Sequence, residues 1–263
     1  MTKLKISIFI LILTLLTSCE FFKDTLTYKD KTKAFVEDLM KKDYDQCISQ
    51  MALESDLGKG INIDTLKMEL DQFRVLIERN FGNKFEYSFM KSEKKRSSIT
   101  NQNTPPNTIL VLIEFSNKKE LGVFQVLFDD KSKKIINIRT LNVKQPKPNM
   151  LLFWLFGLLP LTVLLFNIYV IRQIKKSSLQ KKWLKYIIVI FLNVPAISYA
   201  AVNGLSFKLL SFQILLGISF SFTGYLNSVW TFGIPLGGFY YLWKVRQRRN
   251  NENVNTEGGS LHE

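Results

Sequence analysis

The sequence of 263 residues is poor in the residue types that build metal and redox sites. It has two cysteines, Cys19 and Cys47, and one histidine, His262. It contains no cysteine and histidine cluster with zinc-ligand spacing, no glycine-rich phosphate-binding loop and no G-x-S-x-G nucleophile elbow. The signatures of a zinc site, a P-loop nucleotide-binding protein and an α/β-hydrolase are therefore absent. We expect a non-enzymatic protein without cofactor or metal.

Acidic residues are too few to balance the basic ones, and the formal net charge is +14. Residues 20–149 are nearly balanced, with 23 basic against 19 acidic residues. Most of the excess lies in two short stretches, 172–185 and 244–249, which carry six and four basic residues and no acidic one. Both stretches adjoin apolar runs, as basic residues do beside membrane spans under the positive-inside rule. We therefore do not expect nucleic acid as a partner.

The amino-terminal residues have the pattern of a secretory signal peptide. Lys3 and Lys5 precede an 11-residue apolar run, residues 6–16. This run is too short to span a bilayer comfortably, so residues 1–18 are interpreted as a signal peptide. An uncleaved signal anchor is the alternative.

The end of this segment resembles the lipobox of bacterial lipoproteins, with the residues Leu16, Thr17, Ser18 and Cys19. The resemblance implies thioether attachment of diacylglycerol to Cys19, cleavage before it, and acylation of the new amino terminus. A cysteine is needed because its sulfur is the nucleophile. If lipid occupies Cys19, no disulfide within the chain is possible, and Cys47 is expected to be a buried apolar residue on a helix.

The next part of the chain predicts a tether over residues 19–30 and a folded domain over 31–145. Helical spacing of apolar residues predicts three helices. The first carries Ala34, Phe35, Leu39 and Met40; the second follows a cap at Asp43 and carries Tyr44, Cys47, Ile48 and Met51. The third follows a cap at Asp64, with an apolar stripe of Leu66, Leu70, Phe73, Leu76 and Ile77.

After the helices the apolar period changes to two, which predicts strands. Phe85, Tyr87 and Phe89 alternate with polar residues, and three runs rich in β-branched and aromatic residues follow at 108–115, 122–128 and 135–143. Because the connections at 117–120 and 129–134 are short and polar, we expect an antiparallel meander. The stretch 96–107 is expected to be a longer loop.

This order of helices and strands, with the stretch AFVEDLMKKDYDQCISQM (34–51), resembles nuclear-transport-factor-like and cystatin-like domains. The resemblance implies a cone in which a curved sheet wraps a long helix; an unrelated α+β sandwich is the alternative. Members of that family sometimes hold an aspartate and histidine pair in the cone. Here the one histidine lies in the polar tail. A carboxylate dyad remains open, although Asp38, Asp43, Asp45 and Glu54 fit solvated helix faces and caps.

The carboxyl-terminal half predicts a membrane domain over residues 151–245, after a polar linker at 146–150. Three spans are expected, at about 151–171, 183–203 and 225–243, so that both basic stretches lie on the cytoplasmic side. Residues 205–222 then form an interfacial or re-entrant segment, or part of a fourth span. Asn167, Asn193 and Asn227 are expected to hydrogen-bond between helices, and Pro235 to kink the third span. Residues 246–263 are expected to be a disordered cytoplasmic tail.

Together these patterns predict an α+β domain, made of helices and a four-stranded meander, followed by an all-α three-helix transmembrane domain. We expect a bacterial inner-membrane lipoprotein that is lipid-anchored and multi-pass, with its folded domain extracytoplasmic. Membrane lipid is the expected partner, covalently at Cys19 and around the spans. The expected role is binding or scaffolding of an unidentified protein. The alternatives are an immunity-type protein against a membrane toxin, a transporter subunit, or a small enzyme that uses the cone pocket.

Overall fold

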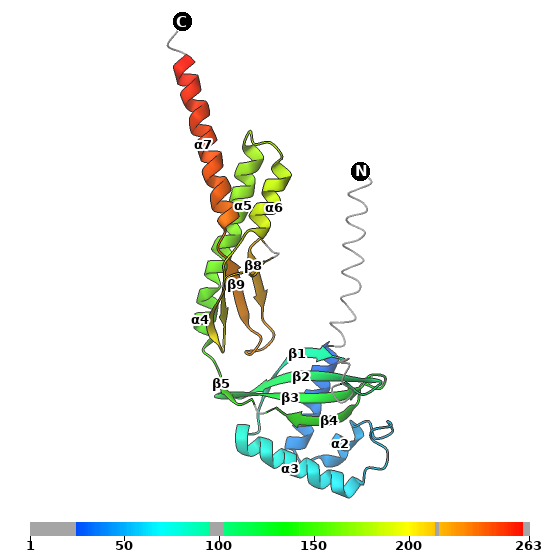
Figure 1. The fold of residues 1–263 in the computed structure, drawn as a ribbon. Helices are drawn as coiled ribbons and strands as arrows, with labels where there is room; N and C mark the ends of the chain where they lie inside the picture. Colours follow the sequence, from blue (N-terminus) through cyan, green and yellow to red (C-terminus); the bar gives the residue numbers. More distant parts are fainter. Residues whose placement is uncertain (1–24, 95–102, 142, 214–215, 260–263) are drawn as a thin grey trace. The chain divides into compact units, whose positions relative to one another are not determined.

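A computed structural model describes residues 25–94, 103–141, 143–213 and 216–259. The chain divides into two compact units, Met1–Lys147 and Pro148–Glu263. Both units combine helices with an antiparallel sheet (Figure 1). The predicted α+β class is therefore confirmed, and it extends into the second unit.

The described part of the first unit begins with a helix over residues 25–40, called the first helix below. Two more helices follow, α2 (Tyr44–Ser49) and α3 (Ile63–Phe81). The predicted tether is wrong for residues 25–30, because Tyr28 is only 1% exposed and lies two helical turns before the buried Phe35, on the same face. Tertiary packing makes these residues part of the core.

Side-chain caps define the starts of the two later helices. Asp43 caps α2 as predicted, since its carboxylate accepts a hydrogen bond from the Gln46 amide at 3.1 Å. The predicted cap of α3 at Asp64 is wrong. Asn62 is the cap, and its Oδ1 accepts from the amides of Asp64 at 2.9 Å and Thr65 at 3.2 Å. Asp64 lies in the first turn, where its charge is favourable to the helix dipole.

A four-stranded antiparallel meander follows, in the order β1-β2-β3-β4, as predicted. Its strands are β1 (Glu86–Glu93), β2 (Thr108–Ser116), β3 (Glu120–Asp129) and β4 (Ile135–Thr140). The register of β1 against β2 shifts between Phe89 and Lys91, which marks a bulge. A fifth short strand, β5 (Gln145–Pro146), pairs with β3, so part of the predicted linker belongs to the sheet.

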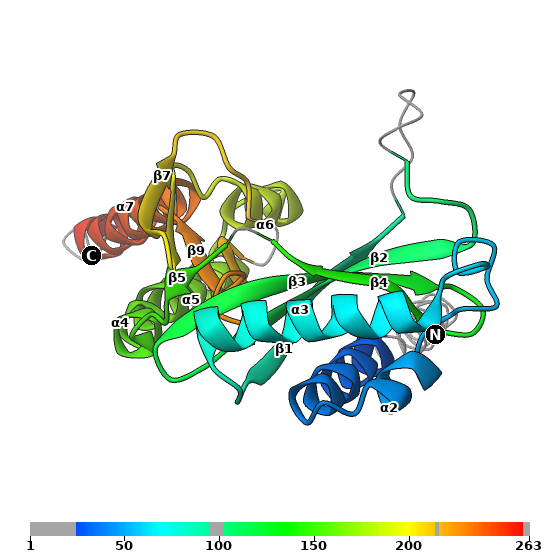
Figure 2. The same ribbon diagram turned by 90° about the horizontal axis from the view of Figure 1, so that it is seen from below.

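The core of the first unit lies between its helices and one face of this sheet, along which α3 runs (Figure 2). At the centre the rings of Phe115 and Phe124 stack with centroids 4.0 Å apart. Gly122 pairs with Phe115 across the strands, and a Cβ there would lie 2.5 Å from the Phe115 ring. Glycine at this position therefore makes room for the aromatic stack.

The predicted apolar stripe of α3 is correct in part. Leu66, Leu70 and Ile77 are buried, but Leu76 is 42% exposed. Arg74 takes a buried place on the same face, because its charge is balanced by neighbouring carboxylates. A hydropathy pattern cannot reveal such a pairing.

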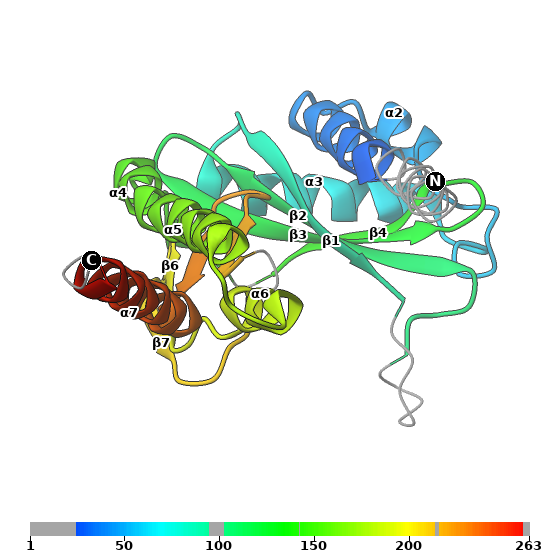
Figure 3. The ribbon, with the colours of Figure 1, turned by 90° about the horizontal axis from the view of Figure 1, so that it is seen from above.

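The described part of the second unit contains four helices and four strands. They are α4 (Met150–Phe156), α5 (Leu158–Lys176), α6 (Lys182–Phe191), β6 (Ala196–Ala200), β7 (Gly204–Lys208), β8 (Ile218–Ser221), β9 (Val229–Gly233) and α7 (Leu236–Gly259). The sheet has the antiparallel order β7-β6-β9-β8. Helices α5, α6 and α7 pack on one another (Figure 3), while α4 and α5 contact the sheet. Of the described helices, one, Met150–Lys176, is long and apolar enough to cross a membrane.

The predicted all-α three-helix membrane domain is therefore wrong. The second predicted span, 183–203, consists of the ten-residue helix α6 followed by strand β6. The helix ends where Asn193 Nδ2 donates to the carbonyls of Val189 and Ile190, and Pro195 then has no amide hydrogen to continue it. Beyond it, polar Ser198 alternates with apolar neighbours at a strand period.

The third predicted span, 225–243, also contains both kinds of structure. Strand β9 ends at Gly233, and α7 begins at Leu236, so Pro235 lies before the helix and does not kink it. The segment 205–222 holds strands β7 and β8. The predicted disordered tail, residues 246–263, is helical to Gly259, where it continues α7.

Candidate functional site

The carboxylates considered for a catalytic dyad are engaged in local structure. Asp38 accepts from Gln50 Nε2 at 2.8 Å and pairs with Lys41. Asp45 pairs with Lys67 at 2.7 Å, and Asp43 caps α2. Glu54 lines a surface pocket between the helices and the β3–β4 turn. Within the described residues no group of three His, Cys, Asp or Glu side chains could hold a metal ion.

Cys47 is buried, and its Sγ lies 3.6 Å from the carbonyl oxygen of Phe35. Burial, together with the nearby carboxylates of Asp38 and Asp43, raises the pKa of this thiol to about 12. At neutral pH the side chain is therefore a thiol and a poor nucleophile. This agrees with its expected place as an apolar residue on a helix.

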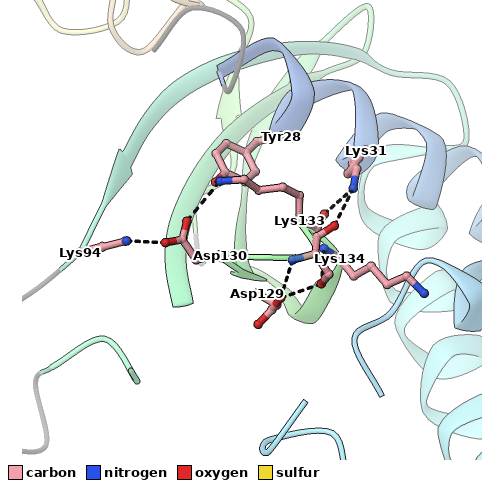
Figure 4. Close-up of polar contacts among 8 residues, drawn as sticks. Tyr28, Lys31, Lys94, Asp129, Asp130, Lys133 and Lys134 are labelled. Atoms are coloured by element: carbon pink, nitrogen blue, oxygen red, sulfur yellow. Dashed lines mark hydrogen bonds and ion pairs between the residues drawn. The ribbon is translucent and has the colours of Figure 1, made fainter. Parts of the chain in front are cut away.

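A polar network in the first unit joins the first helix to the β3–β4 turn (Figure 4). Lys133 Nζ donates to Tyr28 Oη at 2.8 Å and pairs with Asp130 at 3.2 Å. Lys94 Nζ reaches the other oxygen of Asp130 at 2.6 Å. From the first helix, Lys31 Nζ donates to the carbonyl of Lys133 at 2.8 Å. The network therefore holds the turn against the helix.

The pKa shifts in this network follow from the same contacts. Burial lowers the pKa of Lys133, but its hydrogen bonds to Tyr28 and Asp130 outweigh burial and raise the pKa overall. Burial and the charges of Lys134 and Lys133 lower the pKa of Lys31. The hydrogen bond from Lys94, and then Lys133, lowers the pKa of Asp130. Asp130 and Lys133 therefore stabilise each other's charged forms, whereas burial and the neighbouring lysines disfavour the charged form of Lys31.

A second network surrounds Arg74 and links α2 to α3. Its guanidinium donates to Asp71 Oδ1 at 2.9 Å and to Glu78 at 2.5 Å. Tyr44 from α2 donates its hydroxyl to the same Asp71 carboxylate. Burial and this hydrogen bond raise the pKa of Tyr44. The burial of Arg74 was not predicted from the sequence, although carboxylates three and four residues away on α3 were a signal for it.

The second unit presents a large exposed apolar surface along α4 and α5. Leu165, in the middle of α5, is 65% exposed. Eight neighbours on the two helices are also exposed: Leu151, Leu152, Trp154, Leu155, Leu158, Leu159, Leu161 and Tyr169. Monomeric soluble proteins rarely expose apolar patches of this extent.

Aromatic side chains gather at the end of this surface where α4 meets the sheet. Phe153 lies 6.1 Å from Trp230 and 6.3 Å from Phe222, between ring centroids. Gly157 between α4 and α5 gives Trp230 room, since a Cβ there would lie 2.8 Å from the indole. Aromatic rings are enriched where a membrane protein meets the bilayer interface.

Basic side chains gather at the opposite end of the three helices, where they form a surface that we call the basic collar. Its members are Arg172, Lys175, Lys176, Lys181, Lys182, Lys185, Lys244, Arg246, Arg248 and Arg249. Contacts join the two basic stretches: Arg249 Nη2 lies 3.4 Å from Gln173 Oε1, and Arg248 Nη1 3.5 Å from the Ser178 carbonyl. The fold therefore unites the two predicted clusters.

Acidic residues are scarce in the sequence around the collar, where Glu252 is the nearest one. No aspartate or glutamate occurs from residue 131 to residue 251. The hydrogen bonds of the collar go to neutral groups, such as that from Lys182 Nζ to the Lys175 carbonyl at 2.9 Å. Among the described side chains of the second unit there is therefore no carboxylate to neutralise this charge.

The lipobox residues Leu16, Thr17, Ser18 and Cys19 lie outside the described residues, as does His262. Comparison of the chain with models of known protein families, with curated proteins and with solved structures found no match. The lipobox and the nuclear-transport-factor-like resemblance therefore remain predictions from the sequence.

Proposed function

We propose that the protein is a bacterial inner-membrane lipoprotein with a non-enzymatic binding or scaffolding role. Its second unit integrates into the bilayer through α4 and α5, and lipid on Cys19 supplies another attachment. The first unit, a folded α+β domain, presents a binding surface on the extracytoplasmic side. The observation that carries this proposal is the exposed apolar surface of α4 and α5, which ends at the basic collar.

The dimensions of this surface support membrane integration. Helix α5 has 19 residues, which corresponds to about 28 Å and is close to the thickness of a bilayer's hydrocarbon core. Its only charged residues lie at its carboxyl-terminal end, where long basic side chains can extend toward water. A basic end of this kind favours the cytoplasmic side.

The other elements of the second unit limit the number of spans. Helix α6 has ten residues, about 15 Å, which is too short to cross a bilayer. Strands β7 and β8 are the edges of the described sheet, and open edges are not tolerated in hydrocarbon. These edges must therefore contact water or protein, and one crossing by α5 is the arrangement we propose.

A binding or scaffolding role is supported by the first unit. Many of its described charged groups are engaged in networks that hold helices and turns together. A span with a lipid anchor would keep such a module at the membrane, because insertion of a transmembrane helix is effectively irreversible.

A pair of matched substitutions tests membrane integration. Leu165→Glu introduces a charge on α5, whereas Met68→Glu introduces one on α3 of the first unit, at a side chain that is similarly exposed (65% and 60%). A charge in the middle of a span costs about 2.5–3.5 kcal/mol of insertion free energy. We expect L165E to reduce the fraction that resists alkaline carbonate extraction, and M68E to leave it unchanged. If wild-type protein is extracted by carbonate, the proposal is wrong.

Orientation and lipidation are tested separately. In a Cys47→Ala background, a cysteine introduced as Asn255→Cys should remain unlabelled by an impermeant thiol reagent in intact spheroplasts and react after lysis. Labelling in intact spheroplasts would place the carboxyl terminus outside. Mass spectrometry of the mature amino terminus should show lipid on Cys19, and an unmodified Met1 would refute the anchor.

Cross-linking in native membranes tests the binding role. The cross-linked proteins would be compared between the wild type and a variant whose first unit, residues 25–147, has been deleted. A discrete partner that depends on the first unit would support scaffolding. A profile that does not change on deletion would contradict it.

A further inference from the structure

We propose that the basic collar binds the headgroups of anionic phospholipids, a step that rests on the membrane integration proposed above. The ligand class is a diacyl phospholipid with a net negative headgroup, of which phosphatidylglycerol is the simplest. The collar would then act as a lipid-selective contact surface, in addition to the apolar insertion of α5.

The basic collar concentrates positive charge on one surface of the second unit. Ten basic side chains come from three helices and the α5–α6 connection, and contacts between α7 and the α5 end hold them together. Seven are exposed, and three are half-buried. Within the described side chains their hydrogen bonds go to neutral groups such as the Lys175 carbonyl, and these contacts leave the positive charge available to an anion.

Exposed aromatic side chains adjoin the basic collar. Trp183 at the start of α6 and Trp243 on α7 are each 61% exposed and adjoin collar residues in the sequence. Lys244 Nζ lies 5.6 Å from the centroid of the Tyr240 ring. Basic groups beside exposed indole rings match a ligand that carries an anionic headgroup on acyl chains.

This combination selects phospholipid over a free anion. Inorganic phosphate would satisfy the basic groups alone and leave the adjacent apolar surface in water. A phospholipid satisfies both at once, because its phosphate lies at the depth where a helix leaves the hydrocarbon. The ligand of the basic collar is therefore the lipid headgroup.

The test uses the full-length protein reconstituted into vesicles of phosphatidylcholine containing about a third phosphatidylglycerol. In one set the phosphatidylglycerol acyl chains are brominated, and in the other the phosphatidylcholine chains, because bromine quenches nearby tryptophan fluorescence. The quenching that is lost in a Trp183→Phe/Trp243→Phe variant reports lipid at the collar. Both side chains are exposed, so this variant is expected to fold.

We expect brominated phosphatidylglycerol to quench the two collar tryptophans severalfold more, at equal mole fraction, than brominated phosphatidylcholine. The variant R246Q/R248Q/R249Q should remove most of this preference, because each basic residue near an anionic surface contributes up to about fivefold in binding. The matched control K33Q/K41Q/K59Q removes three charges from surface sites of the first unit and should leave the preference unchanged. High salt should weaken it, because salt screens exposed charges.

Equal quenching by the two lipids in wild-type protein would overturn the collar proposal while leaving membrane integration intact. Loss of the preference in both triple variants would also overturn it, because the effect would then come from net charge. If carbonate releases the protein from phosphatidylcholine vesicles, integration is what fails. If inorganic phosphate abolishes the preference, a free anion is the ligand and the lipid assignment is wrong.

Discussion

Asn167 on α5 donates a hydrogen bond from its Nδ2 to Oδ1 of Asn193, at 2.8 Å, and both side chains are fully buried. The same Nδ2 donates to the carbonyl of Leu216 at 2.8 Å. Asn193 in turn donates to the last carbonyls of α6. This amide pair therefore joins α5 to the end of α6 and to the segment before β8, and the predicted hydrogen bonding of these two asparagines is confirmed.

The first prediction follows from this pair. Asn167→Ala removes the donor to the buried Asn193 Oδ1 and to the part-buried Leu216 carbonyl, so we expect the free energy of unfolding of the second unit to fall by about 1–2 kcal/mol. Asn227→Ala is the matched control, because Asn227 makes no side-chain hydrogen bond within the described residues. Thermal unfolding in a mild detergent measures both. Equal melting temperatures for the two variants would contradict the role of the pair.

The second prediction concerns the close approach of β9 to the chain after α6. A Cβ at Gly233 would lie 1.9 Å from the backbone oxygen of Asn193, and this clash cannot be relieved by a side-chain rotation. We expect Gly233→Ala to destabilise the second unit by more than about 3 kcal/mol. At Gly204, which has φ +71° and no neighbour within 4 Å, alanine meets only backbone strain and should cost about 1 kcal/mol. Limited proteolysis in detergent would rank the two variants, and a Gly233→Ala protein as resistant as wild type would refute the clash.

The third prediction corrects the limits of the first unit. A fragment of residues 31–145 lacks Tyr28, whose ring centroid lies 4.8 Å from that of Phe128 and whose hydroxyl accepts from Lys133. We expect the fragment 20–147 to unfold cooperatively in urea and 31–145 to be less stable by about 3–5 kcal/mol, the usual cost of losing a buried aromatic side chain. In the longer fragment, Tyr28→Phe keeps the ring and should cost only about 1 kcal/mol. If the two fragments have the same urea midpoint, Tyr28 is not part of the core.

The first unit was largely predictable because its patterns are periodic and local. The meander follows from alternating residues such as Phe85, Tyr87 and Phe89, and from short polar turns. Arg74 could not be placed by pattern, since its burial depends on Asp71 and Glu78. The same limit applies to Tyr28, which becomes part of the core only through its contact with Phe128 in β3.

The second unit was mispredicted because average hydropathy hid its period. Between Ala196 and Gly233 the residues are apolar enough for a span, yet Ser198 and Thr231 alternate with apolar neighbours. The hydroxyls of these two residues are hydrogen-bonded at 2.8 Å across β6 and β9. The Asn203–Gly204 pair, with Gly204 at φ +71°, is a hairpin signal that was present in the sequence. By contrast, the union of the two basic stretches depends on how α5, α6 and α7 pack. No local pattern contains that information.

The last prediction concerns the pH dependence of the first unit, through Asp130. Lys94, and then Lys133, hold the pKa of its carboxyl below the ordinary value, so its charged form is favoured in the folded state. A depressed pKa contributes stability that is present above the unfolded value of about 3.9 and is lost as the pH falls through the folded value. The side chain is 32% exposed, so solvent screening limits the effect to less than about 1 kcal/mol.

We expect the urea midpoint of fragment 20–147 to fall between pH 5 and pH 3, and Asp130→Asn to reduce this fall, because the amide does not titrate. Asp56→Asn, at an ion pair whose carboxylate is 94% exposed, is the control and should retain the full pH dependence. An Asp130→Asn fragment that loses as much stability as wild type over this range would show that its ion pairs with Lys94 and Lys133 contribute nothing.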